Sequence, residues 1–201
     1  MSQPLKSPLA DDALDQLFRR ARTYNGYLDI PVTREQIDAI WELMKFGPTS
    51  ANALPARLVW CLSQDAKDKL ASFAGNTNGA KVRNAPVSVI IGMDIDFHEN
   101  LPWLFPHNPG MKDYLTDPAA REVMALRNSS LQGAYFILAA RALGLDTGPM
   151  SGFDNAGVDA AFFGTTPRIK SNFISTLGHG DPATIFGRSP RPGFEAFNTV
   201  L

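Results

Sequence analysis

The sequence predicts a single α+β domain, in which helices and strands are mixed along the chain. Its 201 residues are 44% hydrophobic and 19% charged, the composition of an ordinary globular domain with a real core. Apolar residues recur at helical spacing in several segments, of which 117–143 is the longest. A near-continuous apolar run at 85–93 is typical of an interior strand. No repeat, low-complexity tract or linker divides the sequence, so residues 1–201 are expected to form one domain.

Helix boundaries follow from apolar periodicity combined with end signals. Thr33, with Gln36 three residues later, predicts a capping box at the start of a helix. Asp117 followed by Pro118 predicts the start of the longest helix, which is expected to end at Gly144. The expected helices span 8–21, 33–46, 64–73, 117–143 and 155–163. The residues of the second helix that are expected to face the core are Ile37, Ile40, Trp41, Leu43 and Met44.

Strands are expected at 57–62, 85–93 and 172–177. Residues 75–79, GNTNG, predict a flexible loop whose polar side chains could reach a ligand. Residues 94–117 are rich in proline and aromatic residues and predict a lid-like excursion.

Residues 131–143 are apolar nearly all round, so this half of the long helix is expected to be buried by its own domain or by a partner subunit. The tail, 188–201, has too weak an apolar pattern to fold alone and could wrap around a partner.

Composition and charge exclude several classes of function. A net charge of −1 gives no reason to expect a nucleic acid or a membrane surface as partner. Met1 to Leu9 lack the apolar core of a signal peptide. No apolar run reaches the ~18 residues of a membrane span. A cytoplasmic location is therefore expected. The single cysteine, Cys61, excludes an internal disulfide and a multi-thiolate metal site. It lies in the apolar run LVWCL and is expected to be buried in a strand.

The common catalytic motifs are missing from the sequence. There is no GxGxxG fingerprint, no P-loop, and no GxSxG, because Gly148 to Gly152 has the wrong spacing. The three histidines are not at metal-ligand spacing, so no metal is expected. His98 and His107 are expected to be solvated in the excursion, and His179, which follows a strand, is expected to be structural.

Polar motifs stand at five places along the chain. The most prominent is the turn 45–57, KFGPTSANALPAR, which holds short hydrogen-bonding side chains between two prolines. The other four are Arg22-Thr23-Tyr24-Asn25, Asn78 with Lys81, Gly148-Pro-Met-Ser-Gly152, and Arg188-Ser-Pro-Arg191. Together they offer guanidinium, ammonium, hydroxyl and amide groups, which are the groups that bind phosphates and the polar edges of ring cofactors.

With these motifs in this order, the chain resembles the FMN-dependent nitroreductase family, and within it the short branch of proteins similar to malonic semialdehyde reductase. The runs GPTSAN, RNSS and GLDTGPMSGFD carry the resemblance, which extends from about Leu14 to Phe194. It implies a nitroreductase-like fold, with a central and mostly antiparallel sheet flanked by helices. It also implies an intertwined homodimer with FMN at the subunit interface.

The resemblance implies which residues hold the flavin. The arginine and hydroxyl of the first motif hold the flavin, and the C-terminal arginines grip its phosphate. Asn78 and Lys81 reach the pyrimidine edge and ribityl chain. Backbone groups around Ser151 approach the N5 and O4 atoms, and the GPTSAN turn reaches over from the second subunit. The implied cofactor-binding residues are Arg22, Thr23, Asn25, Pro48, Thr49, Ser50, Asn52, Asn78, Lys81, Met150, Ser151, Gly152, Arg188 and Arg191.

The chain departs from the family pattern at three positions. Asn25 stands where the family often has a second arginine, and Gly193 stands where a second basic residue is expected near the C-terminus, for which Arg188 could compensate. Ser151 replaces a glutamate that many members carry near flavin N5, so substrate handling could differ. The aromatic residues of the excursion could stack on a planar acceptor or pack in the dimer interface; they are Trp103, Phe105 and Tyr114.

The reaction that the resemblance implies is ping-pong. NADH or NADPH delivers hydride to flavin N5 and leaves, and a small acceptor (a nitro compound, quinone, enone or semialdehyde) then takes the electrons. No catalytic side chain is required, because the cofactor carries the chemistry. A flavin-binding carrier or sensor without turnover stays open because of Ser151. A small hydrolase using Ser50 or Ser151 is the third alternative, although it lacks a spaced His/Asp constellation.

Overall fold

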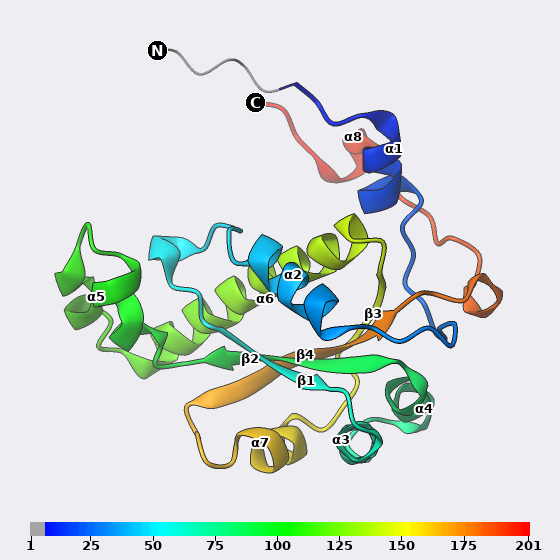
Figure 1. The fold of residues 1–201 in the computed structure, drawn as a ribbon. Coiled ribbons are helices and arrows are strands. Elements are labelled where there is room, and N and C mark those ends of the chain that lie inside the picture. Colours follow the sequence, from blue (N-terminus) through cyan, green and yellow to red (C-terminus); the bar gives the residue numbers. More distant parts are fainter. Residues whose placement is uncertain (1–6) are drawn as a thin grey trace.

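A computed structural model describes residues 7–201 and places one four-stranded sheet between helices (Figure 1). The strands lie in the order β1-β2-β4-β3, and every neighbouring pair is antiparallel. Their bounds are Ala56–Cys61 for β1, Val87–Asp94 for β2, Asp146–Met150 for β3 and Ile169–Gly178 for β4. The predicted α+β fold with an antiparallel sheet is therefore confirmed. The signal-peptide prediction concerns residues 1–9, of which 1–6 lie outside the described residues.

The helices cover both faces of this sheet (Figure 1). α2 and α6 pack on one face, and α3, α4 and α7 pack on the other. The chain begins with α1 and a π-helical turn, and ends with the short α8 beside them. The helix bounds are Asp11–Leu14 (α1), Asp15–Arg19 (π turn), Arg34–Met44 (α2), Gln64–Ala71 (α3), Asn76–Asn84 (α4), Leu101–Leu104 (α5), Pro118–Ala142 (α6), Asn155–Phe163 (α7) and Phe194–Phe197 (α8).

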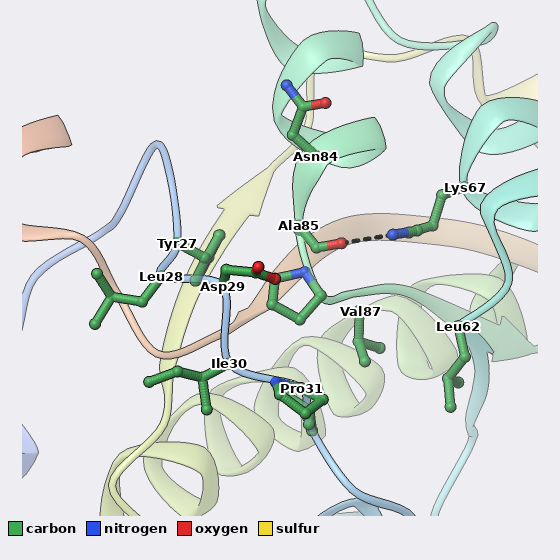
Figure 2. A pocket seen from close by; sticks show the side chains of 12 residues that line it. Tyr27, Leu28, Asp29, Ile30, Pro31, Leu62, Lys67, Asn84, Ala85 and Val87 are labelled. Atoms are coloured by element: carbon green, nitrogen blue, oxygen red, sulfur yellow. Dashed lines mark hydrogen bonds between the residues drawn. The ribbon is translucent and has the colours of Figure 1, made fainter.

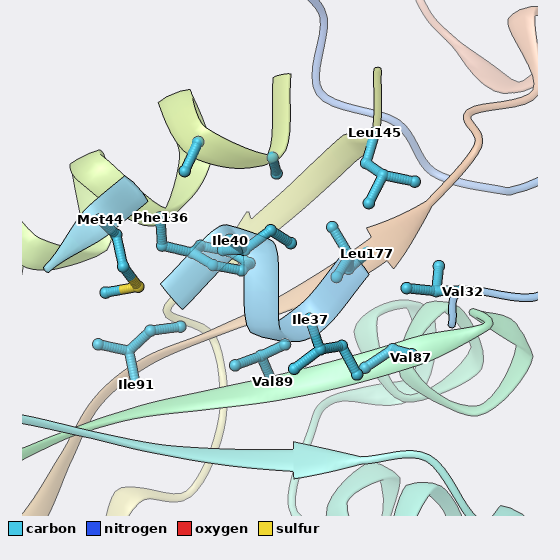
Figure 3. Packing of buried hydrophobic residues seen from close by; sticks show 12 residues of the cluster. Val32, Ile37, Ile40, Met44, Val87, Val89, Ile91, Phe136, Leu145 and Leu177 are labelled. Carbon is cyan, nitrogen blue, oxygen red and sulfur yellow. The ribbon is translucent and has the colours of Figure 1, made fainter. Parts of the chain in front are cut away.

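Strand β2 is the centre of the core because it is buried along its whole length. Successive side chains of a strand point to opposite faces of its sheet. Val89 and Ile91 thus contact the cluster under α2 and α6, which Figure 3 shows around Ile40 and Phe136, whereas Ile90 packs with α3, α4 and α7. A strand buried on both faces is apolar along most of its length, which explains the run that predicted it. Its two buried polar residues have partners: Ser88 donates to the Val82 carbonyl, and Asp94 pairs with Arg57.

The end signals in the sequence predicted the helices of the first face well. The Thr33–Gln36 capping box is present in both directions, and α6 runs from Pro118 to Ala142 as expected. Gly144 follows it with φ of 75°, a left-handed conformation that glycine adopts without strain. α7 has the expected bounds, whereas the strands differ from expectation by one residue at β1 and by several at β4.

Other expectations were wrong. Residues 76–84 form α4 rather than continuing a flexible loop from 75 to 79. Gly79 allows α4 to lie against α3, because a Cβ there would stand 2.9 Å from the Ala71 carbonyl oxygen. Strand β3 had not been expected at all, and the first helix is shorter than 8–21. Trp41 and Leu43 are 41% and 47% exposed in the single chain, so they do not belong to its core.

The second half of α6 is only partly buried in the single chain. Leu131 and Leu143 are exposed, whereas Phe136, Ala139 and Ala140 are buried against the sheet. Of the two alternatives for this segment, complete burial within its own domain is therefore wrong. No helix in the described part of the chain is long and apolar enough to cross a membrane.

Cys61 is 1% exposed at the end of β1, as expected. Burial raises the pKa of its thiol to about 11. Because the thiolate is the reactive form, we expect the folded protein at pH 8 to resist a thiol reagent such as Ellman's reagent. About one equivalent should react after denaturation in guanidinium. Rapid labelling of the native protein would contradict this burial.

Candidate functional site

The most highly charged cavity that we find lies where the end of the first helix meets the C-terminal segment. It has a volume of about 370 Å³ and is termed the arginine pocket. Its polar lining consists of Arg22, Thr23, Asn25, Arg141, Arg188, Ser189 and Arg191. Five of these seven residues, all except Arg141 and Ser189, were predicted as site residues from the sequence, from motifs more than 160 residues apart.

Hydrogen bonds join the two segments that form the arginine pocket. The Arg22 guanidinium donates to the Phe186 carbonyl, and Arg188 Nη2 donates to the Ala21 carbonyl at 3.0 Å. The Asn25 side-chain amide donates to the Thr184 carbonyl at 2.8 Å. The arginines are thus held by backbone carbonyls, while their remaining N–H groups are left for a ligand.

Strand β3 lies next to the arginine pocket. Thr23 pairs with Thr147 in a parallel bridge, and the Tyr24 N–H donates to the Thr147 carbonyl at 3.3 Å. Burial raises the pKa of Tyr27, whose hydroxyl lies 2.6 Å from Thr176 Oγ1. The Thr147 hydroxyl oxygen is buried and has no hydrogen-bond partner among residues 7–201. A buried hydroxyl without a partner, next to arginines that have no carboxylate partner in the described chain, is the kind of polar surface that a bound ligand satisfies.

The other end of β3 reaches a second group of predicted residues. Met150 and Ser151 line a shallow, mostly apolar hollow of about 350 Å³, together with Pro149 and Phe173. Met150 lies three residues along the strand from Thr147, which corresponds to about 10 Å. The arginine pocket and the apolar hollow therefore lie along one strand.

Helix α4 brings the predicted amide and lysine to this end of β3. Asn78 Nδ2 donates to the Gly152 carbonyl at 3.3 Å. A Cβ at position 152 would stand 3.1 Å from that amide nitrogen, so glycine allows the close approach. Lys81 follows one helical turn after Asn78 and is half-buried. The helix that was missed from the sequence is thus the element that orients two predicted residues.

The GPTSAN turn lies elsewhere in the single chain. Figure 1 shows it in cyan at the end of the molecule near α5, away from α1 and the C-terminal segment. The Ser50 N–H donates to Asn128 Oδ1 at 2.8 Å, and the Pro48 carbonyl accepts from the Tyr135 hydroxyl at 2.8 Å. Within one protomer, the turn residues Pro48, Thr49, Ser50 and Asn52 therefore do not join the arginine pocket.

The backbone of this turn is strained. Ala51, Asn52 and Leu54 have φ values of 51°, 51° and 41°, a region that residues other than glycine adopt rarely. Such conformations cost roughly 1–3 kcal/mol each and tend to occur at functional sites. The Thr49 hydroxyl accepts from the Leu54 N–H at 3.2 Å and helps to hold this shape.

The excursion from 95 to 116 consists of short helical turns closed at the base by Arg121. The Arg121 guanidinium donates to the carbonyls of Leu115 and Thr116 at 2.9 and 3.2 Å, and lies 3.3 Å from Asp96 Oδ1. Asn52 Nδ2 donates to the Leu104 carbonyl at 2.8 Å, so the excursion and the GPTSAN turn form one unit.

Two of the three aromatic residues predicted to contact the acceptor are free of the core, since Trp103 and Tyr114 are 79% and 82% exposed. Phe105 instead packs against the buried cluster that contains Phe97, and lies edge-on to His107 with ring centroids 5.7 Å apart. The expectation for His98 was wrong, since its side chain is only 13% exposed and its Nδ1 is buried without a partner. The neighbouring residue, Phe97, is fully buried, which keeps the His98 imidazole close to the core.

A larger cavity, of about 630 Å³, lies at the ends of β1 and β2 and contains none of the predicted site residues (Figure 2). Lys67 reaches into its wall and donates to the Ala85 carbonyl at 2.9 Å, at the C-terminal end of α4. This contact satisfies a carbonyl that the helix leaves unpaired. Among residues 7–201, no group of three or more His, Cys, Asp or Glu side chains could hold a metal ion.

Sequence reasoning missed Arg141 and Thr147 as candidate site residues. Arg141 stands in the last turn of α6, where a cation is expected for its effect on the helix dipole alone. Thr147 lies in the strand that was not predicted. Neither residue carries a local signal that separates a ligand-binding role from a structural one.

An arginine-lined pocket in line with an apolar hollow fits a cofactor that has a phosphate at one end and a planar ring at the other. The chain belongs to the nitroreductase family, whose family model matches residues 18–179.

Relatives and solved structures agree with this membership. A Caulobacter protein from strain K31, named a presumed NADH dehydrogenase/NAD(P)H nitroreductase, is 57% identical over 189 residues, 94% of this chain and 96% of its own length. A presumed nitroreductase from Exiguobacterium sibiricum in complex with FMN superposes with a TM-score of 0.84 at 20% identity, covering 98% of this chain and 100% of that one. An enone reductase of gut-bacterial fatty acid saturation has a TM-score of 0.81 at 17% identity, with 96% and 99% covered.

Proposed function

We propose that this protein is an FMN-dependent oxidoreductase that takes electrons from NADH or NADPH and passes them to a small acceptor. The arginine pocket is the observation that carries the proposal, because it offers fixed positive charge for the FMN phosphate. Membership of the nitroreductase family and the name of the Caulobacter relative support the NAD(P)H dependence. When bound, FMN supplies the redox chemistry at its ring.

The residues of this chain would hold FMN along β3. Arg22, Arg188 and Arg191 bind the phosphate, with Thr23 and Asn25 beside them. Asn78 and Lys81 donate to the pyrimidine edge, where a cation stabilises the negative charge that develops on reduction. Met150, Ser151 and Gly152 would lie beside the ring, and the apolar hollow lined by Met150 and Ser151 would exclude water from that side.

We propose a homodimer in which the partner completes this site. Large apolar side chains are exposed on α2, in the turn that follows it and on α6, among them Trp41, Leu43, Phe46 and Leu131. Their burial against a second copy would stabilise association by roughly 25 cal/mol per Å² of apolar surface. The partner would supply the GPTSAN turn (Pro48, Thr49, Ser50 and Asn52) together with its attached excursion. Trp103, Phe105 and Tyr114 would then approach the acceptor.

The acceptor belongs to a small electrophilic class: a nitro compound, a quinone, an enone or a semialdehyde. Ser151 is exposed beside the apolar hollow and carries no charge at neutral pH, so the site lacks the carboxylate that the resemblance leads one to expect there. An acceptor that itself carries a carboxylate, such as a semialdehyde acid, would therefore meet no like-charge repulsion from position 151.

The visible spectrum of the purified full-length protein tests the proposed function. We expect a yellow protein whose flavin absorbance bleaches under anaerobic NADH or NADPH and recovers when one of these acceptors is added. A flavin that bleaches with neither nucleotide would support a carrier instead. A colourless protein that also fails to bind added FMN would overturn the proposal.

Replacement of Lys81 by alanine should slow the bleaching of flavin absorbance by NADH or NADPH about tenfold. The reason is the loss of one partly exposed cation near the developing negative charge, worth about 1.4 kcal/mol. Stopped-flow spectroscopy at saturating nucleotide measures this rate. Arg83→Ala is a matched control on the same helix, because Arg83 pairs with Asp68 and lies outside both pockets. An unaltered rate in Lys81→Ala would remove Lys81 from the site.

A further inference from the structure

The arginines of this chain divide into two groups by their partners. Within the part of the chain that the structure describes, seven arginines form ion pairs with carboxylates: Arg19, Arg20, Arg34, Arg57, Arg83, Arg121 and Arg168. The remaining arginines are Arg22, Arg127, Arg141, Arg188 and Arg191. All of these except Arg127 line the arginine pocket. Among the described residues, the guanidinium groups without a carboxylate partner are therefore concentrated in one cavity.

Arg141 differs from its neighbours in the pocket because it comes from the core of the fold. It stands in the last turn of α6, while the other three arginines lie in the chain segments at the two ends of the sequence. Its Nη1 donates to the Leu17 carbonyl at 2.8 Å, which fixes the direction of the guanidinium. Its Nε is buried and finds no hydrogen-bond partner in the described part of the chain.

The charges around Arg141 favour an added anion. Burial lowers the pKa of Arg141, and the nearby positive charge of Arg188 lowers it further. The one carboxylate whose charge opposes this effect is Asp146, which is itself half-buried and accepts a hydrogen bond from the Gly180 N–H at 3.0 Å. Two guanidinium groups held side by side repel each other unless an anion lies between them.

We propose that Arg141 is a fourth phosphate-binding arginine and the residue that makes this pocket select FMN over riboflavin. The inference rests on the proposed function, since it assigns the anion as the phosphate of the same flavin. Because α6 is packed against the sheet, Arg141 supplies charge from a fixed position, whereas Arg188 and Arg191 lie on an exposed segment. A preorganised cation loses less conformational entropy when the phosphate binds.

A purely structural role for Arg141 has a different consequence. A cation at a helix C-terminus stabilises the helix, and the bond to Leu17 ties the first helix to α6. Loss of these contacts would weaken every flavin equally, because it would disturb the pocket and not the recognition of phosphate. The ratio of FMN affinity to riboflavin affinity thus separates the two roles.

The test titrates FMN and riboflavin into the full-length protein freed of flavin, with dissociation constants taken from the quenching of flavin fluorescence. We expect Arg141→Gln to weaken FMN binding about 10- to 100-fold, the effect of one charge-assisted hydrogen bond, and to change riboflavin binding less than about threefold. Arg127→Gln is the matched control, an unpaired arginine on the same helix outside the pocket, and should change neither constant. Equal weakening of both flavins in Arg141→Gln, or no change in either, would overturn the proposal.

A second measurement uses the unchanged protein and does not depend on the folding of a variant. Phenylglyoxal modifies accessible guanidinium groups, and peptide mass spectrometry locates the sites. FMN, but not riboflavin, should protect Arg141, while Arg127 should react in every case. Equal modification of Arg141 with either flavin would contradict a phosphate contact. Failure of the unchanged protein to bind either flavin would instead refute the proposed function itself.

Discussion

Arg22→Ala is expected to weaken FMN binding about 100-fold, the upper end of the range for one charge-assisted contact. The loss is large because two interactions disappear together. The phosphate loses a guanidinium, and the Phe186 carbonyl loses its donor, so the segment that carries Arg188 and Arg191 is held less firmly. Flavin content after extensive dialysis and titration of the flavin-free protein both measure the effect.

Arg19→Ala is the control for this substitution. Arg19 stands three residues earlier, is paired with Asp11 and Asp15, and does not line the pocket. Its removal should leave flavin content unchanged and cost less than about 1 kcal/mol of stability, as for other exposed ion pairs. Full flavin occupancy in Arg22→Ala would show that Arg22 does not belong to the cofactor site.

Asp94→Ala is expected to lower the free energy of unfolding by about 3 kcal/mol. The Asp94 side chain is fully buried at the end of β2, with Arg57 Nη2 at 2.8 Å and Arg168 Nε at 3.6 Å from its oxygens. Removing one partner of a buried pair costs roughly 3–5 kcal/mol, and the lower value applies because both arginines keep partial access to water. Urea denaturation followed by circular dichroism gives the free energy directly.

Asp94 also fixes the start of the excursion, since its Oδ1 accepts from the Asp96 N–H at 3.0 Å. Hydrogen exchange should therefore increase between 95 and 116 in Asp94→Ala, in addition to the global loss of stability. Asp38→Ala, which removes an exposed ion pair with Arg34 on α2, is the control and should cost about 0.3–0.5 kcal/mol. If both substitutions lowered the free energy of unfolding by a similar amount, the burial of Asp94 would not add to its contribution to stability.

The sequence predicted the elements whose signals are local. The Thr33 capping box, the Asp117-Pro118 helix start and the buried strand β2 each depend on residues within one segment, and each is present. Helix α4 and strand β3 escaped prediction because their residues look like loop residues in isolation. The two glycines are explained only by the folded structure. Gly79 in α4 faces α3, and Gly148 in β3 faces the 24–27 segment, and each neighbour approaches too closely for any side chain.

The candidate site shows the same division. Motif order by itself was enough to identify the nitroreductase family and to nominate Arg22, Asn78, Ser151 and Arg188, because family motifs are contiguous in sequence. Only the tertiary structure decided that Arg22 and Arg188 share one pocket and that Arg141 joins them. It also decided that the GPTSAN turn lies near α5, at the end of the molecule away from α1. Trp41 was wrongly assigned to the core for a related reason, since helical periodicity marks an apolar face without saying whether its own chain covers it. Local propensity acts through neighbours in sequence, whereas charge and packing act through neighbours in space.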